Sequence, residues 1–310
     1  MTRMLKLEGR EMTNRLLFPE GPVVMPDDSV MVVEIKGQRL IRVAPDGDKQ
    51  VAAELGGGPN GAALGPDGKV YVCNNGGFNW LTHDDGYMRP HGRWDRYERG
   101  SIQRVDPESG AVEVLFDACE GESLKGPNDI VFDGKGGFYF TDYGKSWDRL
   151  MDRGALFYAA EDGSFIREVA FPLITPNGVG LSPDGETLYV SETETGRVWS
   201  FPVLEPGVLG KQPWPSPFGG NFVAGPLGYQ RFDSMAIEEC GNICIASLVR
   251  GGISVFAPDG ELLEFWEAPE PYCTNIAFGG QYWRKAYITL SGYGRLIEVD
   301  WPRPGLRLAY

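Results

Sequence analysis

The sequence has 310 residues, of which 42% are hydrophobic and 12% aromatic, so it contains enough apolar material for a large packed core. Its 43 glycines and 23 prolines provide many sharp turns, which helix-rich enzymes seldom need. A formal net charge of −14 repels phosphate backbones and anionic lipid headgroups, so we expect a partner that is neither nucleic acid nor a membrane.

The first residues of the chain, 1–17, are too charged for the apolar core of a signal peptide. No later stretch approaches the roughly 20 apolar residues of a membrane span. The five cysteines are an odd number and do not form a dense disulfide framework. We therefore expect a cytoplasmic protein with reduced thiols.

From residue 18 onward one pattern recurs along the chain. It consists of a small polar motif, often Pro-Asn, then a short apolar strand, a Gly/Asp turn and a second, alternating strand. Three clear copies lie at 57–74, 126–143 and 175–192, and three weaker copies lie at 18–34, 231–247 and 273–289. A repeat of this kind indicates an array of similar structural units.

A second pair of strands follows most copies, again around a Pro/Asp/Gly turn, as at 38–55, 100–116, 154–171 and 251–268. Four strands in each unit, repeated at roughly 40 to 70 residues, are typical of propeller blades. We therefore predict an all-β, six-bladed β-propeller with four antiparallel strands per blade around a central channel. One domain would span residues 1–310. Either the segment up to about Arg15 or the final residues, 305–310, would complete the last blade.

Two insertions interrupt the regular spacing. The first, 76–100, lies between the second and third strands of blade two, and the second, 211–230, immediately precedes the fifth copy. Long loops in a compact repeat are usually lids, binding loops or interface segments. We expect only the second insertion near the channel mouth. Several aromatic residues are candidates for an apolar pocket wall or for packing between blades: Trp80, Tyr87, Trp147, Phe222 and Tyr272.

In a propeller the first strand of each blade lines the channel, so the residues just before these strands converge at the channel mouth. All six of these positions carry a side-chain oxygen: Glu20, Asn60, Asn128, Asn177, Asp233 and Asn275. Asn and Asp also favour turns before strands for local reasons, so turn capping is the alternative interpretation.

The chemistry of these side chains favours a hard cation. Ca²⁺ binds carboxylate, amide and water oxygens, and two carboxylates, Glu20 and Asp233, would neutralise its charge. Zinc would usually require His or Cys ligands. We predict one divalent metal ion bound by Glu20, Asn128, Asn177 and Asp233. Ca²⁺ is favoured, with Zn²⁺, Mn²⁺ or Mg²⁺ as alternatives.

These residues resemble the gluconolactonase family that includes regucalcin, also called senescence marker protein. The resemblance is carried by Pro-Glu-Gly-Pro at 19–22, Pro-Asn-Asp at 127–129, Pro-Asn-Gly at 176–178 and Phe-Asp-Ser-Met at 232–235. It implies a metal-dependent lactonase in which Glu20, Asn177 and Asp233 bind the metal directly, while Asn128 binds it or touches the substrate. Ser234 departs from the family's usual glycine. Lys125 precedes a Gly-Pro pair where animal members have an arginine that binds sugar acids, so sugar-lactone specificity stays open.

We therefore expect hydrolysis of a sugar lactone or another small lactone or ester, with the metal polarising the carbonyl group. Asp233 would deprotonate the attacking water with its non-ligating oxygen. A role as ligand alone is an equal alternative, and a role as nucleophile is a minor one. The candidates for substrate binding are Asn60, Asn128, Asp129 and Asn275. For Asn60, capping of a turn is as good an interpretation as substrate binding. Asp129 could equally be a polar residue beneath the site whose hydrogen bonds are made within the protein.

Three other functions compete with this interpretation. A non-catalytic propeller that presents loops to a protein partner would not need convergent carboxylates, so Glu20 and Asp233 count against it. A strictosidine synthase-like lyase shares the architecture but lacks the four ligand-type residues. A phosphotriesterase-like hydrolase would use the same metal site with a different substrate.

Overall fold

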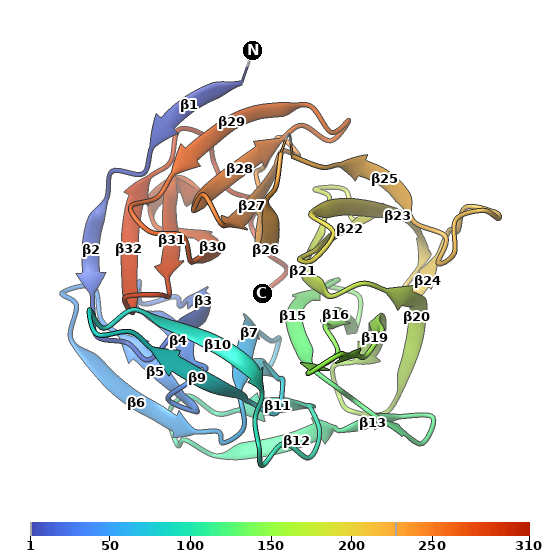
Figure 1. The fold of residues 1–310 in the computed structure, drawn as a ribbon, viewed down its shortest axis with the longest axis horizontal. Coiled ribbons are helices and arrows are strands. Elements are labelled where there is room, and N and C mark those ends of the chain that lie inside the picture. The colour runs from blue at the N-terminus through green and yellow to red at the C-terminus, as the bar shows by residue number, and fades with distance from the viewer. Residues whose placement is uncertain (1, 227) are drawn as a thin grey trace.

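The computed structural model describes residues 2–226 and 228–310, which form six sheets of four or five strands in a ring around a central channel (Figure 1). The inner strands contact one another in sequence around the ring, and the last contacts the first. In the described part of the chain the one helical element is a 3₁₀ turn, η1 (Gln281–Trp283), and no helix there could span a membrane. The predicted six-bladed, all-β propeller is confirmed.

In the first three blades the strands follow in chain order from the channel outward, and each pairs antiparallel with the one before. The strands of blade one are β3 (Pro19–Val24), β4 (Val30–Glu34), β5 (Arg39–Val43) and β6 (Lys49–Glu54). Those of blade two are β7 (Pro59–Leu64), β8 (Val70–Asn74), β11 (Ser101–Val105) and β12 (Val112–Phe116). Those of blade three are β15 (Pro127–Phe132), β16 (Gly137–Asp142), β19 (Gly154–Ala160) and β20 (Ile166–Leu173).

The last three blades have their inner strands arranged in the same way, and blades five and six each add an outer strand from the start of the chain. The strands of blade four are β21 (Pro176–Leu181), β22 (Thr187–Glu192), β23 (Arg197–Glu205), β24 (Val208–Leu209) and β25 (Asn221–Ala224). Those of blade five are β26 (Arg231–Ile237), β27 (Ile243–Leu248), β28 (Gly252–Phe256), β29 (Leu262–Glu267) and β1 (Arg3–Lys6). Those of blade six are β30 (Cys273–Gly279), β31 (Lys285–Leu290), β32 (Arg295–Asp300) and β2 (Arg10–Thr13).

The start of the chain closes the ring. Strand β2 pairs antiparallel with β32 and completes blade six, while β1 adds a parallel strand to the outer edge of blade five. The sequence left open whether the first or the last residues of the chain complete the last blade, and the structure shows that the first residues do so. Residues 305–310 instead run across the end of the channel, where the C-terminus is marked at the centre of the ring in Figure 1.

Apolar faces of neighbouring blades pack against each other and fill the space between the sheets. For example, Met31 and Val33 of β4 share one cluster with Val70 and Val72 of β8, and all four are fully buried. Because both faces of a middle strand are covered in this way, β4 and β8 consist of buried residues along their whole length. The blades thereby hold the inner strands rigidly around the channel.

The first insertion lies between β8 and β11, the second and third strands of blade two, as predicted. It forms a hairpin of β9 (Phe78–Thr82) and β10 (Met88–Arg93). It lies over one channel mouth: Met88 N donates a 2.8 Å hydrogen bond to Gly292 O, and the Trp80 ring lies 5.0 Å from the Phe18 ring. We expected only the second insertion near the channel mouth, but the first insertion covers it. Two smaller hairpins pair β13 (Ala118–Cys119) with β14 (Glu122–Ser123), and β17 (Ser146–Trp147) with β18 (Leu150–Met151).

The expected position of the second insertion at the channel mouth is wrong for residues 211–224. Strand β25 pairs with β23 on the outer side of blade four, and the preceding loop projects from the periphery of the ring in Figure 1. Trp214 and Phe222 are 84% and 59% exposed there. An outer strand edge exposes unpaired backbone groups, and β24 covers only the far end of β23. The insertion supplies the missing edge strand.

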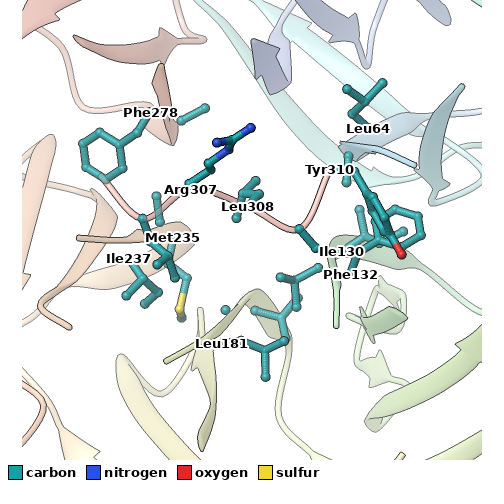
Figure 2. Close-up of a pocket in the computed structure, with 18 of the residues that line it drawn as sticks. Leu64, Ile130, Phe132, Leu181, Met235, Ile237, Phe278, Arg307, Leu308 and Tyr310 are labelled. Atoms are coloured by element: carbon teal, nitrogen blue, oxygen red, sulfur yellow. The ribbon is translucent and has the colours of Figure 1, made fainter. Parts of the chain in front are cut away.

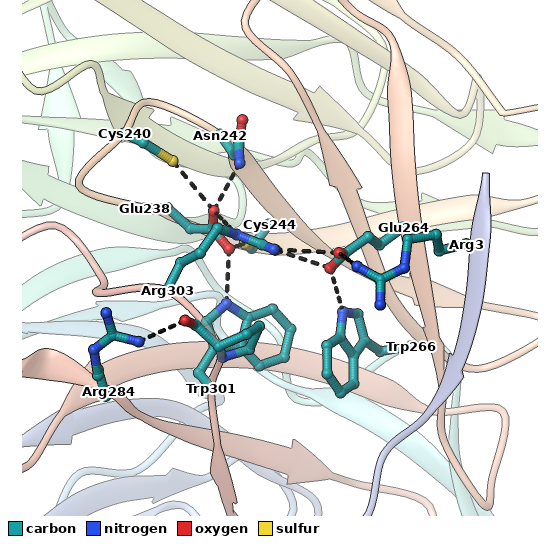
Figure 3. Close-up of polar contacts among 11 residues, drawn as sticks. Arg3, Glu238, Cys240, Asn242, Cys244, Glu264, Trp266, Arg284, Trp301 and Arg303 are labelled. Carbon is teal, nitrogen blue, oxygen red and sulfur yellow. Dashed lines mark hydrogen bonds and ion pairs between the residues drawn. The ribbon is translucent and has the colours of Figure 1, made fainter. Parts of the chain in front are cut away.

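A buried polar network anchors residues 301–305 to blade five (Figure 3). Arg303 Nε donates a 2.6 Å hydrogen bond to Glu238 Oε2, and its two terminal nitrogens donate to both carboxylate oxygens of Glu264 at 3.2 and 2.8 Å. Trp301 Nε1 donates to the second oxygen of Glu238 at 2.7 Å. Burial raises the pKa of Glu238, but these hydrogen bonds outweigh it and hold the pKa below its ordinary value.

Candidate functional site

A shift in strand register changes the direction of the polar side chains on the inner strands. Each inner strand shifts register against its second strand close to the predicted position: between Glu20 and Val23, Pro59 and Ala62, Pro127 and Ile130, Pro176 and Val179, Phe232 and Met235, and Cys273 and Asn275. A β-bulge interrupts the alternation of side chains and redirects one of them. The repeated motif therefore encodes a repeated bulge at one end of the channel.

Glycine follows the polar residue in several copies because the inner strands approach closely there. A Cβ atom on Gly21 would lie 2.5 Å from the backbone oxygen of Asn60 in the next blade, and Gly21 has a φ of +50°. A Cβ atom on Gly178 would lie 2.8 Å from the backbone nitrogen of Met235. Both distances are shorter than carbon contacts allow, so the Glu-Gly and Asn-Gly pairs set how near the blades can come.

A cavity of about 200 Å³ opens at this end of the channel, under the β9–β10 hairpin. Glu20, Asn128, Asn177 and Asp233 all contribute to its wall, from blades one, three, four and five. The first three are buried, while Asp233 is partly exposed. The structure thus brings the four predicted ligands together, and their binding of a metal stays a prediction.

Two oxygen atoms of this cavity have no hydrogen-bond partner among residues 2–226 and 228–310. They are Glu20 Oε1 and Asn128 Oδ1, both buried. The other oxygen of Glu20 accepts hydrogen bonds from Asn275 Nδ2 at 2.7 Å and Gly21 N at 2.5 Å. Buried acceptors without partners are costly, and a cation is the group that satisfies a carboxylate and an amide oxygen together. The residues present therefore fit an oxygen-bound divalent metal.

The side-chain amide of Asn177 is held by hydrogen bonds within the protein. Its Nδ2 atom donates a 3.0 Å hydrogen bond to Thr193 Oγ1. The Ser234 hydroxyl lies 3.5 Å from Asn177 Oδ1, so the serine that departs from the family pattern contacts a neighbouring predicted ligand. In the described part of the chain no three His, Cys, Asp or Glu side chains gather as a metal cluster, so a metal bound here would need amide oxygens as well as two carboxylates.

The two carboxyl groups of the site are held in an environment that disfavours charge. Burial raises the pKa of Glu20 to about 7, against the lowering effect of its hydrogen bonds from Asn275 and Gly21. Burial also raises the pKa of Asp233 well above its ordinary value, and the nearby charge of Glu20 raises it further. Carboxylates that repel each other in this way favour a bound cation.

The four predicted substrate-binding residues separate into two groups. Asn60 and Asn128 line the cavity beneath the hairpin. Asp129 and Asn275 line a second cavity, toward the other end of the channel. Asp129 Oδ1 accepts a 2.9 Å hydrogen bond from Ile130 N, and Asn275 Oδ1 accepts one of 2.8 Å from Ile276 N. Direct contact of the last two residues with a substrate stays a prediction.

Several residues of the cavity wall were not predicted from the sequence. Phe78 and Pro90 come from the first insertion. Tyr143 directly follows β16 of blade three, and Arg231 begins β26 of blade five. Arg231 forms an ion pair with Glu194. The sequence offered one signal for Arg231, which is its position two residues before Asp233 on the same predicted strand. Burial raises the pKa of Tyr143 to about 12, so its phenol is a hydrogen-bond donor at neutral pH.

Comparison with known proteins places residues 18–292 in a family described as the SMP-30/Gluconolactonase/LRE-like region. A gluconolactonase of Zymomonas mobilis is 30% identical over 233 residues, which cover 72% of this chain and 58% of the relative. The lactonase drp35 of Staphylococcus saprophyticus is 30% identical over 210 residues, covering 66% of this chain and 56% of the relative. The chain thus matches little more than half the length of these relatives.

Solved structures share the fold. A gluconolactonase from Xanthomonas campestris superposes with a TM-score of 0.73 at 22% identity, covering 93% of this chain and 88% of the other. A regucalcin from Agrobacterium tumefaciens, described as a calcium-binding protein, gives a TM-score of 0.75 at 19% identity and covers 99% of this chain and 100% of the other. At these identities the likeness establishes the propeller architecture.

Proposed function

The chain belongs to the SMP-30/gluconolactonase/LRE-like family, and we propose that it hydrolyses a small lactone at a divalent metal ion held in the central channel. One observation carries the proposal. Glu20 Oε1 and Asn128 Oδ1 are buried acceptors without partners in the described chain, in the same cavity as Asp233 and Asn177. Relatives named gluconolactonase and lactonase support lactones as the substrate class.

Glu20, Asn177 and Asp233 would hold the metal, together with Asn128. Ca²⁺ is the ion that this set of carboxylate and amide oxygens favours, and water would complete its coordination. When bound, such an ion supplies Lewis-acid polarisation of the substrate carbonyl group.

Asp233 is the residue that would move the proton. It lines the cavity and is more exposed than the buried Glu20, so it would be able to reach a water molecule beside the substrate. Asp233 would accept a proton from the water as the new C–O bond forms at the lactone carbonyl carbon. It would then return that proton to the ring oxygen as the ring C–O bond breaks, which yields one hydroxy acid.

The rest of the cavity would orient the substrate. The wall above the polar floor includes Phe18, Phe78 and Tyr272, whose rings exclude water from the reacting group. Tyr143 and Arg231, which also belong to the wall, would donate hydrogen bonds to a substrate's oxygen atoms.

The test is a panel of sugar and aliphatic lactones, assayed after treatment with EDTA and after addition of Ca²⁺, Mn²⁺ or Zn²⁺. We expect hydrolysis to be lost on chelation and restored by one of these ions, and Asp233→Asn to lower kcat by about 100-fold or more. Asp162→Asn, the same change at an exposed turn carboxylate, is the control. Activity that survives both chelation and Asp233→Asn would refute the mechanism. Hydrolysis of a phosphotriester but of no lactone would refute the substrate class.

A further inference from the structure

The channel contains a second cavity at the end opposite the β9–β10 hairpin. It has a volume of about 320 Å³ and is lined by the far ends of all six inner strands, together with residues 306–310 (Figure 2). The two ends of the channel are chemically different. Oxygen-bearing side chains gather at one end, and at the other the walls include Leu64, Phe132, Leu181, Ile237 and Phe278.

The floor of this distal cavity is polar, but its hydrogen bonds are already made within the protein. Asp129 and Asn275 form the floor, and their Oδ1 atoms accept hydrogen bonds from the backbone nitrogens of the next residues. The Asn275 amide nitrogen is used by Glu20. An occupant of the cavity would therefore meet apolar side chains on its sides and little unsatisfied polarity beneath.

Residues 305–310 form a strap across the cavity mouth. The strap is anchored at one end, where Leu306 N donates a 2.8 Å hydrogen bond to Ile237 O of blade five. At the other end the Tyr310 ring lies 5.4 Å from the Phe132 ring of blade three, edge to face. Figure 2 shows the strap passing over the apolar side chains between these two points.

The strap covers the cavity without burying its own apolar groups. Leu308 and Tyr310 line the cavity, yet they are 55% and 38% exposed to solvent. Exposed apolar side chains beside an apolar hollow gain stability when a ligand fills the space between them. The strap therefore leaves apolar surface at the cavity mouth that an occupant would bury.

Charges at the rim do not favour an ionic ligand. Apart from Asp129 in the floor, the charged residues of the lining are two acidic ones, Asp133 and Asp184, and two basic ones, Lys135 and Arg307. Asp133 accepts a 2.8 Å hydrogen bond from the Tyr158 hydroxyl, and Asp184 accepts one of 2.5 Å from Ser182. The formal charges of the four cancel, so neither an anion nor a cation is attracted by the rim as a whole.

We propose that the distal cavity is a binding site for a small, uncharged, hydrocarbon-rich molecule, which is held beneath the strap. The volume lies at the lower end of the ~300–1,000 Å³ range of ligand pockets. Contact with its apolar walls would stabilise an apolar guest by removing that guest's surface from water. The site is separate from the cavity that contains Glu20 and Asp233, and the inference does not depend on lactone hydrolysis.

The probe for this site is N-phenyl-1-naphthylamine, an uncharged dye whose fluorescence rises in apolar surroundings, with unlabelled naphthalene as competitor. We expect saturable binding of one dye per chain, displacement by naphthalene, and no effect of EDTA. Leu64→Trp would fill the cavity and lower dye affinity at least tenfold. Leu308→Asp, at an exposed position, would add a charge at the mouth and lower it as well.

Leu204 provides matched controls, because it is a 65% exposed leucine on β23, remote from the channel. Leu204→Trp and Leu204→Asp should bind the dye as the unchanged protein does. Phe78→Ala, in the wall of the other cavity, should also leave binding unchanged. Absence of saturable binding, equal affinity in the Leu64 and Leu204 variants, or loss of binding in Phe78→Ala would each overturn the proposal. Should Leu64→Trp not fold, Leu308→Asp against Leu204→Asp decides the question.

Discussion

Asn275 Nδ2 donates a 2.7 Å hydrogen bond to Glu20 Oε2, and this bond joins the sixth blade to the first inside the channel. With Gly21 N bound to the same oxygen, Glu20 keeps its second oxygen, Oε1, for the cavity. The bond thus serves two purposes, because it ties the two ends of the ring together and fixes which carboxylate oxygen is available.

Asn275→Ala should lower the affinity for Ca²⁺ by about 10- to 100-fold, since hydrogen-bond partners orient metal ligands and their loss has effects of this size. Isothermal titration with Ca²⁺ measures the change. Asn221→Ala is the control, because its amide nitrogen binds only the backbone of Ser200 on the outer edge of blade four. Equal Ca²⁺ affinity in the two variants would contradict the orienting role of Asn275.

The fold and the convergence of the four ligand-type residues could be predicted because both follow from a repeat. In a ring of equivalent units, one sequence position in each unit becomes one place in space, so Glu20, Asn128, Asn177 and Asp233 needed no coordinates to be grouped. The closing of the ring could not be chosen, because β1 and β2 lie outside the repeat and pair with strands more than 250 residues away.

The remaining differences come from backbone detail that a pattern of residue types does not record. The register shift beside each polar residue directs Asn128 to one cavity and its neighbour Asp129 to the other. The second insertion, expected at the channel mouth, instead completes a sheet edge with 221–224, while Phe78 of the first insertion reaches the channel. Neither the direction of these side chains nor the position of the insertions can be deduced from composition or motif spacing.

Lys145 should make stability depend on pH. Its Nζ atom donates to Asn75 Oδ1 and Gly77 O, each at 3.0 Å, and lies 4.0 Å from the centre of the Phe78 ring, so it supports the first insertion from below. Burial lowers its pKa from 10.5 to about 7, with Asp142 and Asp152 raising it and Arg93 lowering it further. Between these pH values the unfolded chain binds the extra proton, so folding becomes more favourable as pH rises.

Lys145→Met removes this proton exchange. The free energy of unfolding of the unchanged protein, minus that of Lys145→Met, should therefore increase by up to about 1.4 kcal/mol per pH unit between about pH 7.5 and 9.5. Urea unfolding of both proteins at several pH values gives this difference. A difference that is constant with pH would show that Lys145 keeps an ordinary pKa.

Arg303→Met should destabilise the protein by about 3 kcal/mol at neutral pH, because it leaves the buried carboxylate of Glu238 without its cation and leaves Glu264 with Arg3 alone. The pKa values of both carboxyl groups lie below the ordinary value in the folded protein, where hydrogen bonds from Arg303 outweigh the opposing effect of burial. The stabilisation they provide is present above that ordinary value and is lost as pH falls through the folded pKa values.

The cost of Arg303→Met should therefore shrink below about pH 4, which denaturant unfolding at neutral and acid pH would detect. Arg284→Met is the matched control. Its guanidinium binds only the backbone oxygen of Pro302 in the same segment and contacts neither carboxylate. Similar losses in the two variants would assign the effect to the segment rather than to the carboxylates.

Removal of metal should destabilise the protein more at high pH than at low pH. In the metal-free protein the pKa of Glu20 is raised from 4.5 to about 7 by burial, and that of Asp233 is raised by burial and by the charge of Glu20. A group whose pKa is raised on folding stabilises the fold fully below its unfolded pKa, and this contribution is lost as pH rises through the folded pKa. A bound cation would offset the loss, because it favours the deprotonated carboxylates.

The midpoint of thermal unfolding, compared in Ca²⁺ and in EGTA, should therefore differ little at about pH 5 and by several degrees at about pH 8, since a hundredfold excess of ligand over Kd stabilises by about 2.7 kcal/mol. Glu20→Gln should reduce the difference at pH 8, because it removes one of the two carboxylates that the cation would neutralise. Glu122→Gln, the same change in the small β13–β14 hairpin on blade three's periphery, should leave it intact. If Ca²⁺ raised the midpoint equally at both pH values, its binding would not involve deprotonation of Glu20 and Asp233, and the ligand set would have to be sought elsewhere.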